Sequence, residues 1–194
     1  MGPSIKLTNR LVLRVENETK AAEVLSMYQR NRLIFERFEP TRPANFYSID
    51  YHEAMLRREY KSYMANSFLR YYIYKNPNIS RIIGAVNFNL MRDPNYFSGN
   101  NNSPFTHAEI GYKMDALYQN QGLTYEACMA GIQVMISDYG IRRIDARIHP
   151  DNIASIKLAE KMGFVPLQFE PKSANVMGEY VDIMRYTLDT SHIQ

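Results

Sequence analysis

The order in which strand-like and helix-like patterns follow one another limits the folds open to this chain. Alternating apolar residues predict strands over residues 11–15, 69–74, 82–90, 108–114, 144–148, 164–169 and 180–188. Helices are predicted over residues 21–28, 48–67, 122–139 and 152–163. The turn Asn76-Pro77-Asn78 joins two of the strands into a hairpin, and residues 92–106 are predicted to form a loop. This order favours the α/β class, with one sheet that is partly antiparallel.

Composition narrows the class of protein further. The 194 residues are 45% hydrophobic, which predicts a single folded domain over residues 1–194 with a core of about 8–188. The one cysteine, Cys128, excludes an intrachain disulfide and a cysteine-rich zinc site, and favours a cytoplasmic protein. A net charge of +3 is too small to indicate direct nucleic-acid binding, and no apolar run has the length of a membrane span.

The segment around Gly122 carries the clearest chemical signal. A strand ends at Met114, a short polar turn follows, and a helix opens at Gly122. The first turn of a helix leaves about four backbone N–H groups unpaired, and glycine allows an anion to approach them closely. No acidic side chain occurs between Leu117 and Tyr125, although helices usually favour one there. The pattern therefore suits a phosphate site, but a plain strand–turn–helix with a tight-turn glycine would look the same.

Three motifs connect the chain to a known family. Gln119-Asn120-Gln121-Gly122-Leu123-Thr124 resembles the Gln/Arg-x-x-Gly-x-Gly/Ala signature of the GNAT superfamily of acetyl-CoA-dependent N-acetyltransferases. Residues 143–164, with Asn152 and the closing Gly163-Phe164, resemble that family's fifth strand and following helix, and residues 9–14 resemble its first strand. The resemblance extends over about residues 8–188. It implies a mixed, largely antiparallel sheet, splayed into a V between the fourth and fifth predicted strands and flanked by about four helices.

Within that superfamily the chain is most similar to the Rim-type ribosomal-protein-alanine N-acetyltransferases. Residues 31–43, the start of the last helix at Asn152-x-x-Ser155, and the hairpin residues 176–182 resemble that branch. Three positions depart from the superfamily pattern. Thr124 replaces Gly or Ala, Asn120 stands where Gly is frequent, and Ala159 occupies the place where many members carry a tyrosine that acts as general acid.

The resemblance implies a binding site for acetyl-CoA, used as a cosubstrate without a metal. Backbone groups of Tyr112 and Met114 would pair with the pantetheine arm, and an N–H near Met114 would stabilise the oxyanion. Asn152 would hydrogen-bond the pantetheine. The pyrophosphate would be held by the N–H groups of Gln119, Asn120, Gln121, Gly122, Leu123 and Thr124.

Two side chains are candidates for catalysis by direct attack in a ternary complex. Glu109 could orient a water that takes the amine proton, or it could be a solvated strand residue paired with Arg or Lys. Ser155 could contact the leaving sulfur, or it could simply bond backbone in the first turn of its helix. An α-amine has a pKa near 7.7–8.0, so a sizeable fraction is already neutral. Aromatic residues of the early loop are expected to line the acceptor site: Phe35, Phe38, Phe46 and Tyr47.

Three functions remain open at this stage. The leading hypothesis is acetylation of a protein N-terminal α-amine, such as that of a ribosomal protein. The second is acetylation of a small-molecule amine, namely an aminoglycoside, a polyamine or a metabolite. The third is a relative that binds CoA without turnover, which Thr124 and Ala159 motivate. The tyrosine-rich composition is compatible with a homodimer as well as with a monomer.

Overall fold

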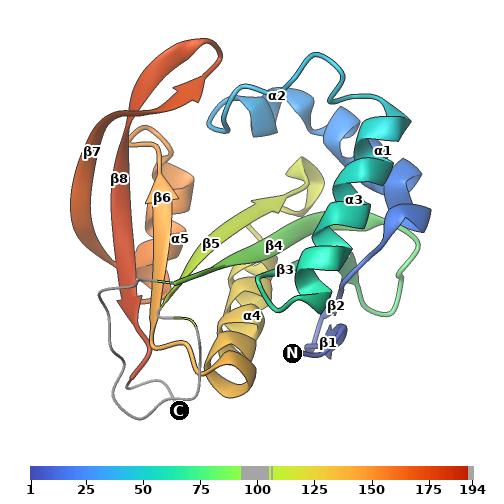
Figure 1. The fold of residues 1–194 in the computed structure, drawn as a ribbon, viewed down its shortest axis with the longest axis horizontal. Helices are drawn as coiled ribbons and strands as arrows, with labels where there is room; N and C mark the ends of the chain where they lie inside the picture. The colour runs from blue at the N-terminus through green and yellow to red at the C-terminus, as the bar shows by residue number, and fades with distance from the viewer. Residues whose placement is uncertain (93–104, 106, 192–194) are drawn as a thin grey trace.

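The computed structural model describes residues 1–92, 105 and 107–191 (Figure 1). Most of the loop predicted over residues 92–106 therefore lies outside the described residues. The elements, in chain order, are β1 Ile5–Leu7, β2 Leu11–Arg14, the 3₁₀ turn η1 Glu18–Lys20, α1 Ala21–Arg30, α2 Arg32–Glu36, α3 Ile49–Met64, β3 Phe68–Lys75, β4 Ile82–Met91, β5 His107–Met114, the 3₁₀ turn η2 Ala116–Tyr118, α4 Leu123–Tyr139, β6 Arg143–Ile148, α5 Ile153–Lys161, β7 Val165–Val176 and β8 Glu179–Asp189.

The described strands form one sheet of mixed direction, which confirms the predicted α/β class. Its order is β1-β2-β3-β4-β5-β6-β8-β7, and every neighbouring pair is antiparallel except β5 and β6. The predicted hairpin is formed by β3 and β4. The parallel pair holds together only where residues 108–110 face residues 144–146, although both strands continue beyond that point. The sheet is therefore splayed between β5 and β6, the fourth and fifth of the predicted strands (Figure 1).

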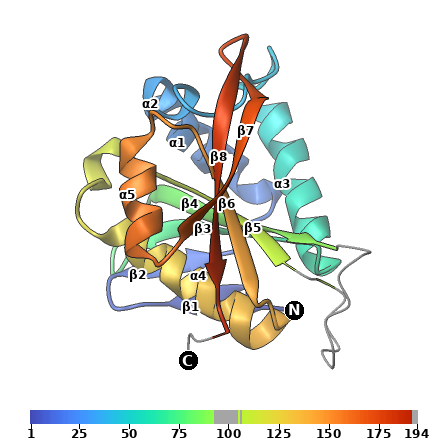
Figure 2. The ribbon, with the colours of Figure 1, turned by 90° about the vertical axis from the view of Figure 1, so that its left-hand side faces the viewer.

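Helices cover both faces of the sheet, and each face has its own core. The larger apolar cluster joins α4 and α5 to one face, and it includes Phe88 of β4 packed beneath Gly131 of α4. A Cβ on Gly131 would lie 2.6 Å from the Phe88 ring, so this glycine permits α4 to approach the strand closely. The smaller cluster joins α1 and α3 to the other face through tyrosines of β3. Figure 2 shows α5 and α3 on opposite sides of the sheet.

Three elements differ from the prediction. β1 pairs with β2 over only three residues, too short a stretch for a periodic pattern to be visible. The five-residue α2 lies in the early loop, which adds a helix to the four that were predicted. β7 continues to Val176 instead of ending at Phe169. β7 is an edge strand with a register shift between Glu170 and Ala174, and Pro171 is tolerated at that shift.

Candidate active site

The start of α4 has the geometry of an anion site. Gly122 caps the helix with φ 73°, in the left-handed region that favours glycine, and no side chain caps it. The first helical bond runs from the Glu126 N–H to the Gly122 carbonyl at 3.1 Å. The N–H groups of the three residues between them precede that bond. Residues 119–122, which lead into this turn, are exposed, so the start of α4 can be approached from solvent.

Glu126, the one acidic residue in the first turn of α4, binds the segment before β2 and does not cap its own helix. The Glu126 carboxylate accepts hydrogen bonds from the Thr8 hydroxyl at 2.6 Å, the Arg10 backbone N–H at 2.9 Å and the Arg10 Nε at 2.6 Å. Burial opposes ionisation, but these donors prevail and lower the pKa of Glu126. Arg10 also donates to the Gln121 carbonyl, and its Nη2 lies 3.5 Å from where a Gly122 Cβ would stand. A guanidinium therefore lies beside the exposed turn.

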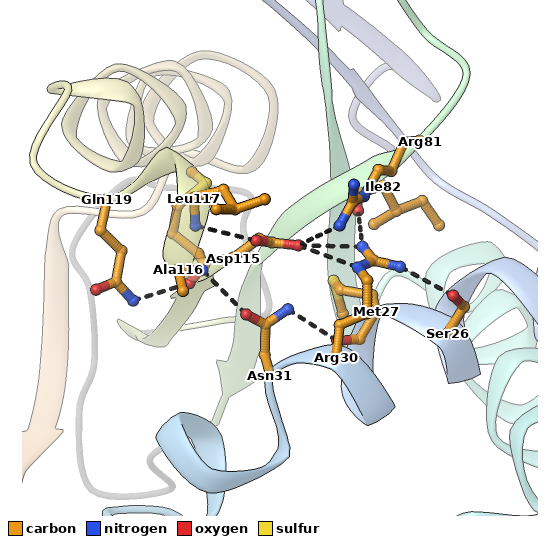
Figure 3. A network of polar contacts seen from close by, with 11 residues as sticks. Ser26, Met27, Arg30, Asn31, Arg81, Ile82, Asp115, Ala116, Leu117 and Gln119 are labelled. Atoms are coloured by element: carbon orange, nitrogen blue, oxygen red, sulfur yellow. Dashed lines mark hydrogen bonds and ion pairs between the residues drawn. The ribbon is translucent and has the colours of Figure 1, made fainter.

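A network around Asp115 holds this turn in place (Figure 3). The Asp115 carboxylate is almost fully buried and accepts from the Leu117 N–H at 3.1 Å and from Arg30 Nη2 at 3.1 Å. Asn31 accepts from the Ala116 N–H at 2.9 Å, which ties the turn to the end of α1. Burial raises the pKa of Asp115, but its hydrogen bonds and Arg30 outweigh that effect, and the net shift is downward. An ionised, paired Asp115 therefore fixes η2, and with it the approach to α4.

At its C-terminal end, the edge of β5 that faces the splay carries main-chain groups that none of the described strands pairs with. The Asp115 N–H donates to the Ile83 carbonyl at 2.8 Å, so the odd-numbered residues of β5 bond to β4. In an antiparallel ladder the alternate residues turn their N–H and C=O groups the other way. Tyr112 and Met114 therefore present theirs toward β6, beyond the last paired residue, Ile110.

The predicted pyrophosphate residue Gln119 takes a different role with its side chain. Its amide Nε2 donates to the Met114 carbonyl at 3.0 Å, drawn in Figure 3. The end of β5 is thereby tied to the turn that leads into α4, and the Met114 N–H is left facing the splay. The free strand edge and the open helix start are thus adjacent. An extended chain with an anionic end fits this combination, as the pantetheine arm and pyrophosphate of CoA require.

Asn152 and Ser155 lie together at the start of α5, on the β6 side of the splay. The Asn152 Oδ1 accepts from the Ser155 N–H at 3.2 Å and caps the helix. This role does not engage the Asn152 NH₂ group. The Ser155 hydroxyl lies 2.9 Å from the Tyr112 hydroxyl, which also donates to the Ser155 carbonyl at 3.1 Å. Ala159, where a tyrosine acid would be expected, is fully buried in the core.

Glu109 lies on the opposite face of β5 from Tyr112. It is half-buried and faces Asp145 across the parallel pair of strands. Burial raises its pKa, and although Arg147 and Arg185 act in the other direction, the net shift is upward. Both arginines pair with Glu170, at 3.0 and 2.5 Å, and Arg185 also lies 3.9 Å from Asp145, so the two are shared with other carboxylates. A carboxyl with a raised pKa is suited to accept a proton near neutral pH.

The four aromatic residues predicted for the acceptor site are divided between the core and the loop surface. Phe35 and Phe46 are buried in the smaller cluster, where they pack edge-on against Tyr28. Phe38 is half-buried with its ring 5.4 Å from that of His149 at the end of β6. The Tyr47 hydroxyl donates to Glu36 at 2.8 Å. Only Phe38 among them reaches the β6 arm of the splay through a ring contact.

The loop after α2 is fastened on both sides of the splay. Glu39 pairs with Lys113 of β5 at 2.7 Å, and with Arg42 within the loop at 2.7 Å. On the other side, Thr41 exchanges bonds with the tip of the β7–β8 hairpin: its Oγ1 donates to Asn175 Oδ1 at 2.6 Å and accepts from the Gly178 N–H at 3.0 Å. Figure 1 shows this loop and the hairpin tip meeting above the splay. We refer to residues 38–43 as the strap.

Several of these residues were not anticipated from the sequence. Asp115 could have been found, because an Asp directly before a short turn commonly caps it. Arg10 with Glu126, and Thr41 with Asn175, are separated by more than 100 positions in the chain, and no local pattern signals such pairs. Cys128 is fully buried in α4, where it packs in the larger apolar cluster, and burial raises the pKa of its thiol.

Two searches of the described residues were negative. No cluster of three or more His, Cys, Asp or Glu side chains is arranged to hold a metal ion in residues 1–92, 105 and 107–191. Within the same ranges, none of the helices combines the length and the apolar character needed to cross a bilayer.

Comparison with known proteins agrees with this geometry. A profile of the acetyltransferase (GNAT) domain matches residues 10–165. A [ribosomal protein uS5]-alanine N-acetyltransferase of Escherichia coli K12 is 26% identical over 190 residues, covering 97% of this chain and 92% of that protein.

Solved structures share the fold at lower identity. A ribosomal-protein-S5-alanine acetyltransferase from Vibrio fischeri superimposes with a TM-score of 0.85 at 21% identity, covering 99% of this chain and all of the other. RimL, a ribosomal L7/L12 α-N-protein acetyltransferase solved with coenzyme A, superimposes with a TM-score of 0.80 at 19% identity, covering 95% of this chain and 97% of RimL.

Proposed function

The chain belongs to the GNAT family of acetyltransferases, enzymes that take their acetyl group from acetyl-CoA, and from this premise we propose that its acceptor is the N-terminal α-amine of a protein, of the ribosomal-protein-alanine type. The observation that carries the acetyl-CoA part of the proposal is the continuity between the amides at the start of α4 and the edge of β5 that faces the splay. Together they offer an extended donor one path into the splay.

The residues of this path suit the parts of acetyl-CoA. The N–H groups of residues 119–124 would hold the pyrophosphate, with the Arg10 guanidinium beside them. Backbone groups of Tyr112 and Met114 would pair with the pantetheine amides, and the free NH₂ of Asn152 would donate to the same arm. When bound, the cosubstrate supplies an acetyl group activated as a thioester. The sulfur end would then lie near Tyr112 and Ser155, where β5 and β6 separate.

Glu109 is proposed to receive the amine proton through a water. Its side chain lies on the face of the sheet opposite Ser155, so the amine and the leaving sulfur are served from different faces. A general base of this kind contributes about 10²–10⁴-fold. A backbone N–H near Met114 would donate to the oxygen that becomes negative during attack.

The acceptor is assigned on two grounds. The similarity to the uS5-alanine enzyme of E. coli extends over 97% of the chain, and so includes the strap and the β7–β8 hairpin. The strap closes over the splay from both sides, which favours a slender acceptor such as an extended peptide end. Ribosomal proteins are made in the cytoplasm, where the proposed reaction would take place.

The test is an acetyl-CoA turnover assay with the full chain and a panel of amines. The panel contains peptides that begin with alanine, the same peptides with blocked N-termini and an internal lysine, spermidine, and an aminoglycoside. We expect CoA release only with free N-terminal peptides, and mass spectrometry should place the acetyl group on the α-amine. Turnover with the small amines alone would reject the proposed acceptor, and tight CoA binding without any turnover would indicate a non-catalytic relative.

A further inference from the structure

The side chain of Tyr112 reaches across the splay on the face covered by α4 and α5. Its backbone is on β5, two residues beyond the last residue that pairs with β6, and its ring packs against the larger apolar cluster. Its hydroxyl meets the first turn of α5 at Ser155, both at the hydroxyl, 2.9 Å away, and at the backbone carbonyl, 3.1 Å away. The two arms that separate in the sheet are therefore reconnected here by a pair of hydroxyl groups.

We propose that Tyr112 is a positioning residue that aims the Ser155 hydroxyl at the sulfur of the leaving group. This inference rests on the proposed function, since it requires CoA to lie in the splay. It adds a role for the Tyr112 side chain, whose backbone alone was expected to take part. Ser155 precedes Ala159 by four residues on α5, and Ala159 occupies the position where many members of the superfamily carry the tyrosine general acid. The proposal therefore supplies a hydroxyl group close to that position.

The argument for positioning comes from the number of protons available. Tyr112 has one O–H, and it can donate either to the Ser155 carbonyl or to the Ser155 Oγ. In the first arrangement the Ser155 hydroxyl can donate its hydrogen bond to the Tyr112 hydroxyl oxygen. In the second arrangement the Ser155 Oγ accepts, and its own proton is free to point into the splay. A negative charge on sulfur favours the second arrangement, because a hydrogen bond to a charged acceptor is the stronger one.

The helix start restricts Ser155 further. Its backbone N–H is held by Asn152 and, in the second arrangement, its hydroxyl by Tyr112, so the residue is fixed at two points. Burial raises the pKa of the Tyr112 hydroxyl, which stays protonated and remains a donor. Tyr112 is partly buried and packs against the apolar cluster of α4 and the sheet, so the pair lies beside a region of low polarity. A hydrogen bond to a developing charge is stronger in such a place than in water.

The step involves hydrogen bonding and no transfer of the serine or tyrosine proton. When the carbon–sulfur bond breaks, the electron pair remains on sulfur, and Ser155 donates a hydrogen bond to that charge while keeping its proton. The thiolate takes its proton from water afterwards. Both hydroxyls are far weaker acids than a thiol, so complete transfer from either would run uphill.

The experiment measures the ionisation of the thiol of CoA bound to the full chain, without any acceptor. Thiolate absorbs in the ultraviolet, so absorbance is followed against pH for the parent chain, Ser155→Ala, Tyr112→Phe and the double variant. A hydrogen bond to a charged group shifts an equilibrium by about tenfold or more. We expect the acid dissociation constant of the bound thiol to fall about tenfold in Ser155→Ala and about threefold in Tyr112→Phe.

The double variant distinguishes positioning from direct contact. Because Tyr112 acts through Ser155, the double variant should match Ser155→Ala, whereas independent contacts would give additive losses. The matched control is Tyr71→Phe, another strand tyrosine that donates to a backbone carbonyl, that of Pro3 at 2.6 Å, outside the splay. It should leave the bound thiol unchanged.

Each failure has its own signature. If Tyr112→Phe lowers the melting temperature but leaves the thiol ionisation at the parent value, the hydroxyl pair is only a structural link and the inference is wrong. Should Tyr112→Phe fail to fold, Ser155→Ala alone decides, since an unchanged thiol in that variant removes the proposed donor. If CoA does not bind the parent chain, seen as an unmoved melting temperature, then it is the proposed function that fails.

Discussion

Gly122 is the position where stability and cofactor binding can be separated most cleanly. Its φ of 73° lies in the left-handed region, and an alanine there would carry a Cβ 3.5 Å from Arg10 Nη2. That distance is an ordinary contact, so the change adds backbone strain without a clash. The Cβ would, however, stand in the space between the guanidinium and the first amides of α4, where the proposed pyrophosphate binds.

The magnitude follows from two separate costs. Left-handed backbone costs a non-glycine residue roughly 1–2 kcal/mol, and the stiffer unfolded chain of alanine returns about 0.4–1 kcal/mol. The net loss of about 1 kcal/mol lowers the melting temperature of a chain of this size by about 2–4 °C. Loss of one amide contact to a charged phosphate costs about 1.5–3 kcal/mol, which weakens CoA binding by roughly ten- to a hundredfold.

Gly163→Ala provides the matched control. Gly163 lies just after the end of α5, also has a positive φ, 92°, and its Cβ would also meet its nearest atom, Leu188 Cδ1, at 3.5 Å. Both variants should lose the same few degrees in a thermal melt without ligand. Calorimetry with CoA should then show weakened binding for Gly122→Ala alone. Equal CoA affinities for the two variants would refute the assignment of the pyrophosphate to the start of α4.

Three further variants test other parts of the site. Glu109→Gln should reduce kcat/KM by about 10²–10⁴-fold and remove the loss of activity at acidic pH in the pH–rate profile. Because burial raises the pKa of Glu109 in the folded chain, the charged carboxylate destabilises the fold above that pKa. The variant should therefore melt at a higher temperature than the parent at pH 8 and lose this advantage in acid, and a lower melting temperature at pH 8 would contradict the reasoning. Glu39→Gln should behave oppositely, because burial opposes ionisation of Glu39 but Lys113 and Arg42 lower its pKa. The Glu39 carboxylate therefore stabilises the folded chain above its unfolded pKa, and this stabilisation is lost as pH falls through the folded pKa. The variant should melt several degrees lower than the parent at pH 7, and the two melting temperatures should converge in acid. Thr41→Ala removes the side-chain hydrogen bonds to Asn175 and Gly178. We expect faster hydrogen exchange at the Gly178 amide and a raised KM for the peptide, with the affinity for CoA unchanged. A change in CoA affinity at constant KM would show that the strap does not serve the acceptor.

The sequence was most informative where a feature depends on neighbouring residues. The start and end of α4 follow from Gly122 and Gly140, because both adopt the left-handed conformation that glycine permits. The start of α5 follows from Asn152, a good N-cap that bonds the Ser155 N–H. The residue types at a few neighbouring positions are sufficient for these helix ends.

Features built from distant segments could not be predicted in the same way. The pairing of Arg10 with Glu126 requires knowing that β2 lies beside the start of α4, which no local pattern records. The early loop illustrates the same point. Its aromatic residues suggested a binding wall, yet Phe35 and Phe46 are buried, because the smaller core between α1, α3 and the sheet needed large side chains. Composition alone does not distinguish an apolar residue that lines a site from one that packs a core.

One strand distributes the parts of the proposed reaction through its alternation. On β5 the odd-numbered side chains Glu109 and Lys113 point toward the strap and the arginines of β6 and β8, while Tyr112 and Met114 point into the cluster of α4 and α5. The main-chain groups alternate as well, so the same even residues face the splay. The proposed base on one face, the proposed positioning tyrosine on the other and a binding edge between them thus follow from a period of two. A single-residue slip of β5 against β4 would exchange all three at once, and the ion pair of Asp115 with Arg30 of α1, at 3.1 Å, opposes that slip at the end of the strand where β6 no longer supports it.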